Sequence, residues 1–410
     1  MTARRRGRCL MARVGSLNAC VGSLRACVGS LKEWAERLLL ACLVPAALTA
    51  AAPPGEGGPD VQETAVRASA ELPLESALRD ALRGEFERQG LVGLAVGVVV
   101  DGRIEELYFG LADRAAGTPV GPDTMFRWAS ISKPLVAVRA VQLARAGEFD
   151  LDADVRELVP EFPEKPWPVT PRQLAGHLGG IVHYSNGEVI RTEREYGVAH
   201  PFVDEVLALD AFKASPLLFE PGTRYSYTTH GYMLLGAAVA RAGGAPLRDQ
   251  IAAGVAAPLG MATLRPDYQW EEIPGRARGY RRAGPLVVPS GDSDVSWKLA
   301  GGGFISTVGD LARFARGLMG EELLPREALD RMWTPLTLRD GERTRYGLGF
   351  GVGRAGEERV IRHSGSQQKT RTFLSVRPDS GRAVVVMTNS EFARTGPIVD
   401  VAWAVLDARR

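Results

Sequence analysis

Hydrophobic residues between positions 74 and 109 follow two different patterns. Over residues 74–89 they are four apart and a glycine follows, at Leu74, Leu78, Leu82, Phe86 and Gly90. This spacing predicts an amphipathic helix that ends at the glycine. Two apolar runs follow, residues 94–100 and 104–109, and Asp101-Gly102 joins them. Short apolar runs joined by Asp-Gly are typical of a β-hairpin.

The last part of the chain carries the same kinds of element. Residues 372–376 and 383–387 are apolar runs on either side of a turn-forming segment at 377–381, which predicts a second hairpin. A shorter strand is predicted at residues 359–362, and it ends at His363-Ser364-Gly365. A final helix is predicted to open at Pro397, with an apolar face formed by Ile398, Val401, Ala402 and Val405.

The middle of the chain lacks long strand patterns. Between residues 150 and 300 we expect helices and loops, with many Pro and Gly residues. The pattern as a whole predicts an α+β fold, an α/β sandwich in which both chain ends form one antiparallel sheet that the terminal helices flank. An all-helical lobe at about residues 150–350 is inserted, and a helix around 135–142 lies at the seam, where clefts form.

The first 70 residues do not share these patterns. Residues 1–52 begin with a basic low-complexity stretch, in which Val-Gly-Ser-Leu recurs three times, and end with an apolar run of 15 residues. That length suits a signal-peptide core; a lipoprotein signal at Cys42 and an uncleaved anchor are the alternatives. Residues 53–70 are predicted to be a linker and 71–410 the catalytic domain. We expect an exported protein, periplasmic or extracellular, with or without a membrane tether.

Composition excludes several kinds of site. All four cysteines precede residue 43, so residues 71–410 can form neither a disulfide nor a thiolate metal site. The sequence has no His-Glu-x-x-His pair and no Gly-x-Ser-x-Gly elbow. Residues 1–40 hold 8 Lys and Arg against 2 Asp and Glu, which leaves 42 against 46 elsewhere. We therefore predict no metal, no cofactor and no nucleic-acid partner; the oligomeric state is left open.

Ser130 and Lys133 are three residues apart where the central helix is predicted to begin. Pro134 is expected to place Ser130 in the first turn, and positions three apart on a helix share a face. A lysine whose pKa is lowered by burial can activate a serine hydroxyl for acyl transfer. The alternative is an ordinary helix start with a solvated lysine. Ser366 and Lys369 have the same spacing but precede a strand-like run.

Three motifs, in this order, resemble the serine β-lactamase-like family, which includes class C β-lactamases, penicillin-binding proteins, family VIII esterases and D-amino-acid peptidases. Ser130-Ile131-Ser132-Lys133 matches Ser-x-x-Lys, Tyr227-Thr228-Thr229 stands at Tyr-x-Asn, and His363-Ser364-Gly365 stands at Lys-Thr-Gly. The resemblance covers residues 74–407, and residues 297–314 look most like the mitochondrial serine β-lactamase-like members. It implies the β-lactamase/transpeptidase fold.

The resemblance also implies roles for single residues. Ser130 would form an acyl-enzyme while Lys133 and Tyr227 transfer its proton, and the backbone N–H groups of Ser130 and Ser366 would form the oxyanion hole. Substrate contacts would come from Thr229, His363, Ser364 and Gly365. His177 matches a histidine read as structural in the family, and cleft-lining positions are suggested for His183, Tyr184 and Trp297. Tyr227 has an alternative reading as a core aromatic residue.

Two positions depart from the family pattern. Thr229 replaces Asn, and His363 replaces Lys, so the positive charge at 363 is expected to be only partial at neutral pH. The alternative for His363 is a strand residue that merely contacts solvent. We therefore predict a serine hydrolase, an esterase or peptidase, for a small ester, amide or peptide. The alternatives are a β-lactamase or D-alanyl-D-alanine carboxypeptidase acting on cell-wall peptide, and a non-catalytic binding or assembly protein.

Overall fold

The computed structural model describes residues 73–409. The predicted extension and signal segment at 1–52 and the predicted linker at 53–70 therefore lie outside the described residues. Within 73–409, no helix combines the length and the apolar character needed to cross a bilayer.

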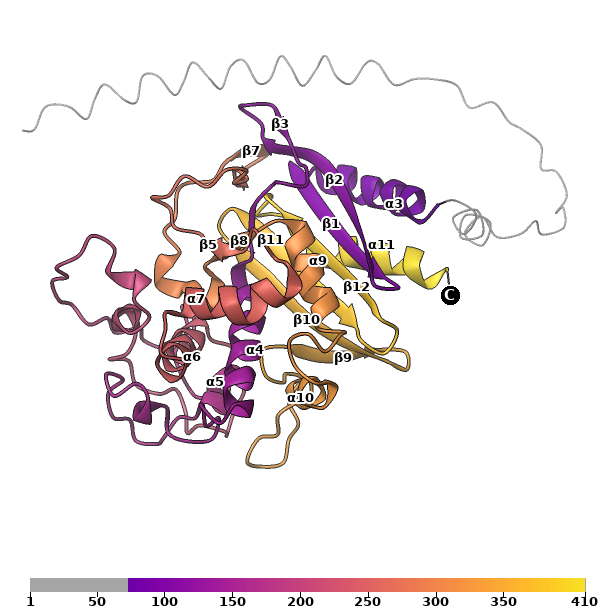
Figure 1. Ribbon diagram of the computed structural model, residues 1–410. Helices are drawn as coiled ribbons and strands as arrows, with labels where there is room; N and C mark the ends of the chain where they lie inside the picture. The colour runs from indigo at the N-terminus through magenta and orange to yellow at the C-terminus, as the bar shows by residue number, and fades with distance from the viewer. Residues whose placement is uncertain (1–72, 410) are drawn as a thin grey trace, which may run out of the picture. The chain divides into compact units, whose positions relative to one another are not determined.

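Strands from both ends of the described region form one antiparallel sheet (Figure 1). Its seven strands lie in the order β3-β2-β1-β12-β11-β10-β9. The strands from the N-terminal side are β1 (Gly93–Val100), β2 (Arg103–Asp113) and β3 (Thr118–Pro119). Those from the C-terminal side are β9 (Gly351–Ala355), β10 (Glu358–Gln367), β11 (Thr370–Arg377) and β12 (Arg382–Thr388). The two predicted hairpins and the predicted α+β arrangement are confirmed.

The hairpin of β1 and β2 follows from its turn residues. Asp101 and Gly102 have φ angles of 52° and 74°, the left-handed conformation that a tight hairpin turn requires at both positions. This turn sets the register of β1 with β2, in which Val96 pairs with Leu107. On its other side, Val96 of β1 pairs with Val386 of β12. The first and last strands of the domain are therefore neighbours at the centre of the sheet.

Helices cover the two faces of the sheet differently. The first and last described helices, α3 (Leu74–Gln89) and α11 (Thr395–Asp407), contact each other on one face (Figure 1). They bury the side chains of Leu94, Val96 and Val384. On the opposite face, α9 (Val308–Gly317) packs on β1 and β12. The predicted last helix begins two residues before Pro397, which lies in its first turn.

The inserted segment is mostly helical. Its helices are α4 (Ser132–Arg145), α5 (Pro171–Ala175), α6 (Thr229–Ala242), α7 (Leu247–Ile251), α8 (Leu299–Gly302) and α10 (Arg326–Met332). Its 3₁₀ turns are η1 (Ala129–Ile131), η2 (Val155–Glu157), η3 (Pro201–Val203), η4 (Leu207–Ala211), η6 (Ala257–Leu259) and η7 (Ser296–Lys298), and η5 (Ala252–Ala256) is a π turn. The sequence did not predict the short strands β4 (Phe126–Arg127), β5 (Arg265–Pro266), β6 (Tyr280–Ala283), β7 (Leu286–Pro289) and β8 (Phe304–Ser306).

One predicted boundary is wrong. Strand β10 does not stop at His363-Ser364-Gly365 but continues through the motif to Gln367. The physical reason is that the period of two continues: His363 and Gly365 are buried, and Ser364 and Ser366 alternate with them on the exposed side. The serines of this motif therefore lie on a strand, where pairing with β11 fixes their positions.

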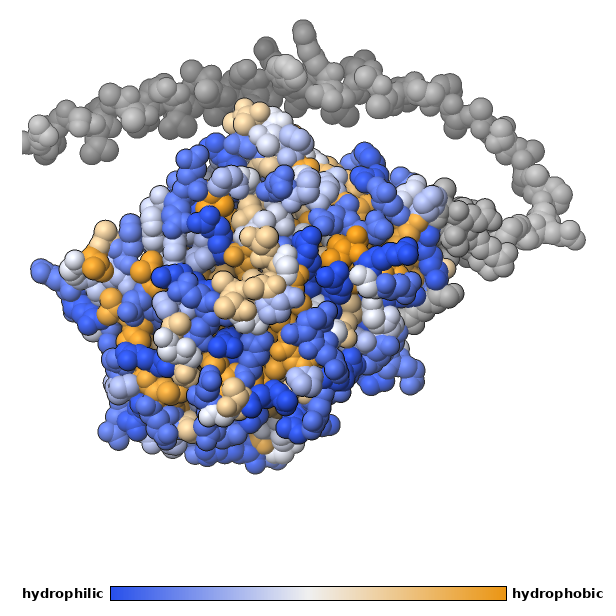
Figure 2. Space-filling model, in the orientation of Figure 1, coloured by the Kyte–Doolittle hydropathy of each residue, from blue (hydrophilic) through white to orange (hydrophobic). Residues whose placement is uncertain are grey.

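Polar residues cover most of the face seen in Figure 2, and hydrophobic residues appear between them in separate patches. Two of the large aromatic residues that reach solvent are Tyr184, 52% exposed, and Tyr225, 43% exposed. Both lie at hollows that border Tyr227.

Candidate active site

Ser130 lies in the 3₁₀ turn η1, directly before α4 rather than within its first turn as predicted. The preceding residue, Ala129, has a φ of 49°, a left-handed conformation that costs a non-glycine residue about 1–3 kcal/mol. Strand β11 helps to hold this turn, because the Thr372 hydroxyl donates to the carbonyl oxygen of Trp128 at 2.9 Å. The sharp turn leaves Ser130 half-buried at the edge of a cavity.

Lys133 is fully buried directly behind Ser130. Its Nζ lies 3.1 Å from Ser130 Oγ, 3.2 Å from Thr229 Oγ1 and 2.7 Å from the carbonyl oxygen of Gly301. Burial lowers the pKa of Lys133 well below its ordinary value, and the charge of Lys298 lowers it further. A neutral amine donates two hydrogen bonds and accepts one, so it can receive the Ser130 proton while it donates to Gly301 and Thr229.

Tyr227 faces both Ser130 and Lys133. Its ring centre is 4.9 Å from Lys133 Nζ, and the Ser130 side chain is near enough to act on the pKa of its hydroxyl. Burial raises the pKa of Tyr227 above its ordinary value, so the phenol keeps its proton at neutral pH. His177 packs against it with ring centroids 4.2 Å apart, and His177 Nδ1 accepts the backbone N–H of Thr228 at 3.2 Å. Tyr227 is therefore part of a polar cluster rather than an isolated core aromatic residue.

Most of the predicted site residues meet at one cavity of about 280 Å³. Of the predicted residues, it is lined by Ser130, Tyr227, Thr229, Ser364 and Ser366. The part of β10 that follows Arg362 pairs with β11 and, among the described residues, with no other strand. The other edge of β10 therefore lies open toward the Ser130 turn.

His363 does not share this cavity. It is buried, its Nε2 lies 2.9 Å from the Tyr346 hydroxyl, and its Nδ1 lies 2.8 Å from the carbonyl oxygen of Ser364. Burial lowers the pKa of His363 to about 3, and the charge of Lys133 acts in the same direction. The predicted partial positive charge is wrong, because the ring is neutral at physiological pH. The alternative of simple solvent contact is also wrong, because the ring is only 6% exposed.

Gly365 allows β10 to approach the Ser130 turn. A Cβ at this position would lie 2.5 Å from the carbonyl oxygen of Trp128 and 3.0 Å from the Ala129 Cβ. Such a contact is too short, so the strand can reach this position only with glycine there. Gly365 thus acts through backbone packing and lies outside the residues that line the cavity.

The sequence did not single out Lys298, which lines the cavity beside Ser130. The only signals were its place before the Ala300–Gly303 stretch and the scarcity of lysine in an arginine-rich chain. Of the suggested cleft residues, His183 and Tyr184 line this cavity, and Trp297 lines an adjoining cavity of about 680 Å³ that shares Tyr184. Within residues 73–409, no group of three or more His, Cys, Asp or Glu is arranged to hold a metal ion.

Comparisons with known proteins identify the family and the fold. The sequence profile of the Beta-lactamase family matches residues 76–406. The human mitochondrial serine beta-lactamase-like protein LACTB is 30% identical over 67% of this chain, and the chain spans 65% of the length of that relative. Esterase EstB of Burkholderia gladioli is 38% identical over 46% of this chain and 49% of its own length.

Solved structures share the fold. The octameric penicillin-binding protein homologue from Pyrococcus abyssi superposes with a TM-score of 0.69 at 24% identity, covering 82% of this chain and 78% of its own. At this identity the likeness concerns the fold alone.

Proposed function

We propose that this chain, which belongs to the Beta-lactamase family of serine hydrolases, hydrolyses a small ester or amide through an acyl-enzyme at Ser130. The observation that carries the proposal is the 3.1 Å contact between Ser130 Oγ and a buried Lys133 whose pKa is strongly lowered. A hydroxyl beside a neutral amine is the combination that nucleophilic acyl transfer requires.

In the first step, Lys133 Nζ takes the proton of Ser130 as Oγ bonds to the substrate carbonyl carbon. The carbonyl π electrons move to the oxygen, which becomes an oxyanion. The backbone N–H groups of Ser130 and Ser366 are the proposed donors to it. This assignment is supported by the open edge of β10 at Ser366 and by the close packing of that edge against the Ser130 turn.

In the second step, the bond to the leaving group breaks as the oxyanion collapses. Tyr227 is placed to pass the proton from Lys133 to the leaving oxygen or nitrogen, because its phenol is protonated and meets both catalytic groups. Water then attacks the acyl-enzyme, gives up its proton through the same residues and releases the acid. Ser130 regains its proton, so the cycle balances.

The absence of a cation on β10 bears on the substrate proposed for this chain. The residue that stands at the lysine of Lys-Thr-Gly is a buried, neutral His363, which supplies no cation to a terminal peptide carboxylate or a β-lactam. This favours esters and simple amides over cell-wall peptides. It leaves the nucleophile and its base unchanged, so the same chemistry is retained.

A fluorophosphonate probe tests the proposal directly. We expect wild-type protein to be labelled and Ser130→Ala to remain unlabelled, while Ser185→Ala, an exposed serine near the cleft, is labelled like wild type. Nitrophenyl esters, nitrocefin and D-amino-acid peptides assayed in parallel would identify the favoured substrate. Equal labelling of wild type and Ser130→Ala would reject Ser130 as the nucleophile. An unlabelled wild type without turnover would favour a binding protein.

A further inference from the structure

Lys298 places a cation in the cleft, beside the neutral amine of Lys133. The side chain is half-buried at the end of η7 and lines the same cavity as Ser130. Its Nζ lies 5.6 Å from the ring centre of Trp297 and 5.9 Å from that of Tyr184. Among the described residues, no carboxylate forms an ion pair with it or contributes to its pKa. A cation in this position lacks a counter-charge from the surrounding protein.

The groups that face Lys298 are cationic or neutral. The charge of Arg127 of β4 lowers the pKa of Lys298, and the charge of Lys298 in turn lowers the pKa of Lys133 of α4. His183 and Tyr184, from the loop after α5, and Tyr227, before α6, line the same cavity. On its own segment, Asp294 accepts hydrogen bonds from Ser296. The cleft therefore presents a positive potential toward the position beside Ser130.

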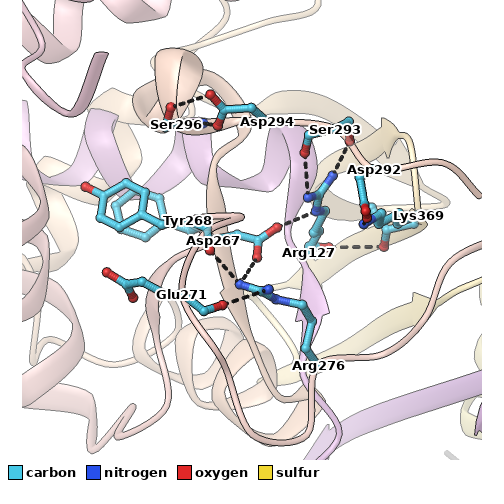
Figure 3. A network of polar contacts seen from close by, with 12 residues as sticks. Arg127, Asp267, Tyr268, Glu271, Arg276, Asp292, Ser293, Asp294, Ser296 and Lys369 are labelled. Atoms are coloured by element: carbon cyan, nitrogen blue, oxygen red, sulfur yellow. Dashed lines mark hydrogen bonds and ion pairs between the residues drawn. The ribbon is translucent and has the colours of Figure 1, made fainter. Parts of the chain in front are cut away.

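A network of polar contacts holds the segment that carries Lys298 (Figure 3). The buried Arg127 forms an ion pair with Asp267 and donates to Ser293 Oγ at 2.7 Å and to the Ser293 carbonyl oxygen at 2.9 Å. Asp292 pairs with Lys369 at 2.7 Å, which ties the same segment to the turn between β10 and β11. Lys298 is thus presented from a fixed backbone, and a bound anion would not have to order it.

We propose that Lys298 binds a free carboxylate of the substrate, so that the preferred substrates are esters or amides of small acids that keep a second, ionised carboxyl group. This inference rests on the proposed function, because it places the carboxylate next to the bond that Ser130 attacks. The neutral His363 leaves the cleft without a cation from β10, and Lys298 supplies one from η7. A charge-assisted hydrogen bond from an ammonium is the recognition that a carboxylate requires.

A matched pair of esters isolates this contact. Mono-4-nitrophenyl glutarate and 4-nitrophenyl valerate have the same chain and differ by a carboxylate in place of a methyl group. After subtraction of the spontaneous rate, we expect wild type to have the higher kcat/KM with the glutarate ester. In Lys298→Met, the ratio of the two kcat/KM values should fall by about tenfold or more, as expected for a lost charged contact. Arg331→Met, which removes a positive charge from an exposed pair on α10, should keep the wild-type ratio.

The pH dependence separates a charge effect from a structural one. Burial lowers the pKa of Lys298 to about 8, and the charge of Arg127 acts in the same direction. The wild-type ratio should therefore be high below pH 8 and fall above it as the ammonium loses its proton. Lys298→Arg keeps its charge and should retain the preference above that pH. This comparison also applies if Lys298→Met fails to fold.

The outcomes distinguish the inference from the proposed function. A ratio near one in wild type, or the same ratio in Lys298→Met, overturns the carboxylate site while leaving the hydrolase intact. If wild type turns over neither ester and Ser130 is not labelled, the proposed function fails. Calorimetric titration with glutarate then decides the carboxylate site alone: weaker binding by Lys298→Met than by wild type supports it, and equal or absent binding overturns it.

Discussion

The Nζ of Lys133 lies closer to the carbonyl oxygen of Gly301, at 2.7 Å, than to the hydroxyl oxygen of Ser130, at 3.1 Å. A carbonyl oxygen can only accept, so this contact fixes one N–H of the amine whatever its protonation state. The contact needs glycine at 301, because a Cβ there would lie 2.4 Å from Thr229 Cγ2. The approach of α8 to α6 therefore orients the proposed base toward the proposed nucleophile.

Lys133→Arg should abolish the proposed hydrolysis. The substitution keeps a positive charge, but a guanidinium cannot be deprotonated in a protein and cannot act as a base. We expect kcat to fall by about a hundredfold to ten-thousandfold, the usual contribution of a general base. Turnover of a nitrophenyl ester measures it. Lys369→Arg is the matched control, since Lys369 has the same spacing from Ser366 but pairs with Asp292. Near-normal turnover in Lys133→Arg would exclude Lys133 as the base.

Thr229→Val should lower kcat clearly and change the stability of the fold little. The substitution keeps the shape of the side chain and removes the hydroxyl that lies 3.2 Å from Lys133 Nζ. With one partner fewer, the amine is less well oriented, and we expect about a tenfold loss of kcat. Steady-state kinetics and thermal unfolding measured together provide the test.

Thr228→Val, at the adjacent position, is the control for Thr229→Val. Its hydroxyl accepts from Gly231 N–H at the start of α6 and donates to the Val182 carbonyl oxygen. Thr228→Val should cost about 1 kcal/mol of stability through the lost helix cap. If the two variants lose kcat and stability in the same proportion, Thr229 has no specific effect on the amine.

Local sequence patterns predicted the elements that local rules govern. The two hairpins and the terminal helices follow from turn residues and from apolar spacing within a few residues. The short strands β4, β5 and β8 have two or three residues each, which is too few to show a period. They form because distant segments meet, as at the pairing of Phe126 with Ser306.

The candidate site, too, could be predicted from local sequence only in part. Spacing and motif order indicated Ser130, Lys133 and Tyr227, which the structure brings together. The neutral state of His363 and the place of Lys298 in the cleft depend on burial and on contacts between residues far apart in the chain. These are properties of tertiary packing, and a pattern of residue types along the sequence does not contain them.

Asp267→Ala should destabilise the fold strongly. The Asp267 carboxylate is fully buried and pairs with Arg127 and, at 3.0 Å, with Arg276 (Figure 3). Its removal leaves the buried Arg127 without its charge partner, which costs about 3–5 kcal/mol. Urea unfolding followed by circular dichroism measures the change.

Glu327→Ala is the control for this prediction, because it breaks the exposed pair of Glu327 with Arg331. Exposed pairs contribute about 0–1 kcal/mol, so its midpoint should shift little. Equal shifts in the two variants would contradict a structural role for the buried network.

The stability of the protein should fall as the pH drops below 6.5, because His363 titrates at 6.5 when unfolded and at about 3 when folded. Above that range the ring is neutral in both states. Within it, only the unfolded chain takes up the proton, so the free energy of unfolding falls by about 1.4 kcal/mol per pH unit for this residue. The lowered pKa values of His177, His183 and His230 act in the same direction.

Comparison of two variants isolates the contribution of His363 to this slope. His363→Gln removes the titrating ring, so its free energy of unfolding should decline less steeply with falling pH than that of wild type. Tyr346→Phe removes the hydroxyl that lies 2.9 Å from His363 Nε2 but keeps the buried ring. That variant should be less stable at every pH and should retain the wild-type slope. Urea unfolding at several pH values gives all three slopes, and identical slopes for His363→Gln and wild type would mean that the His363 ring takes up its proton in the folded state as readily as in the unfolded chain.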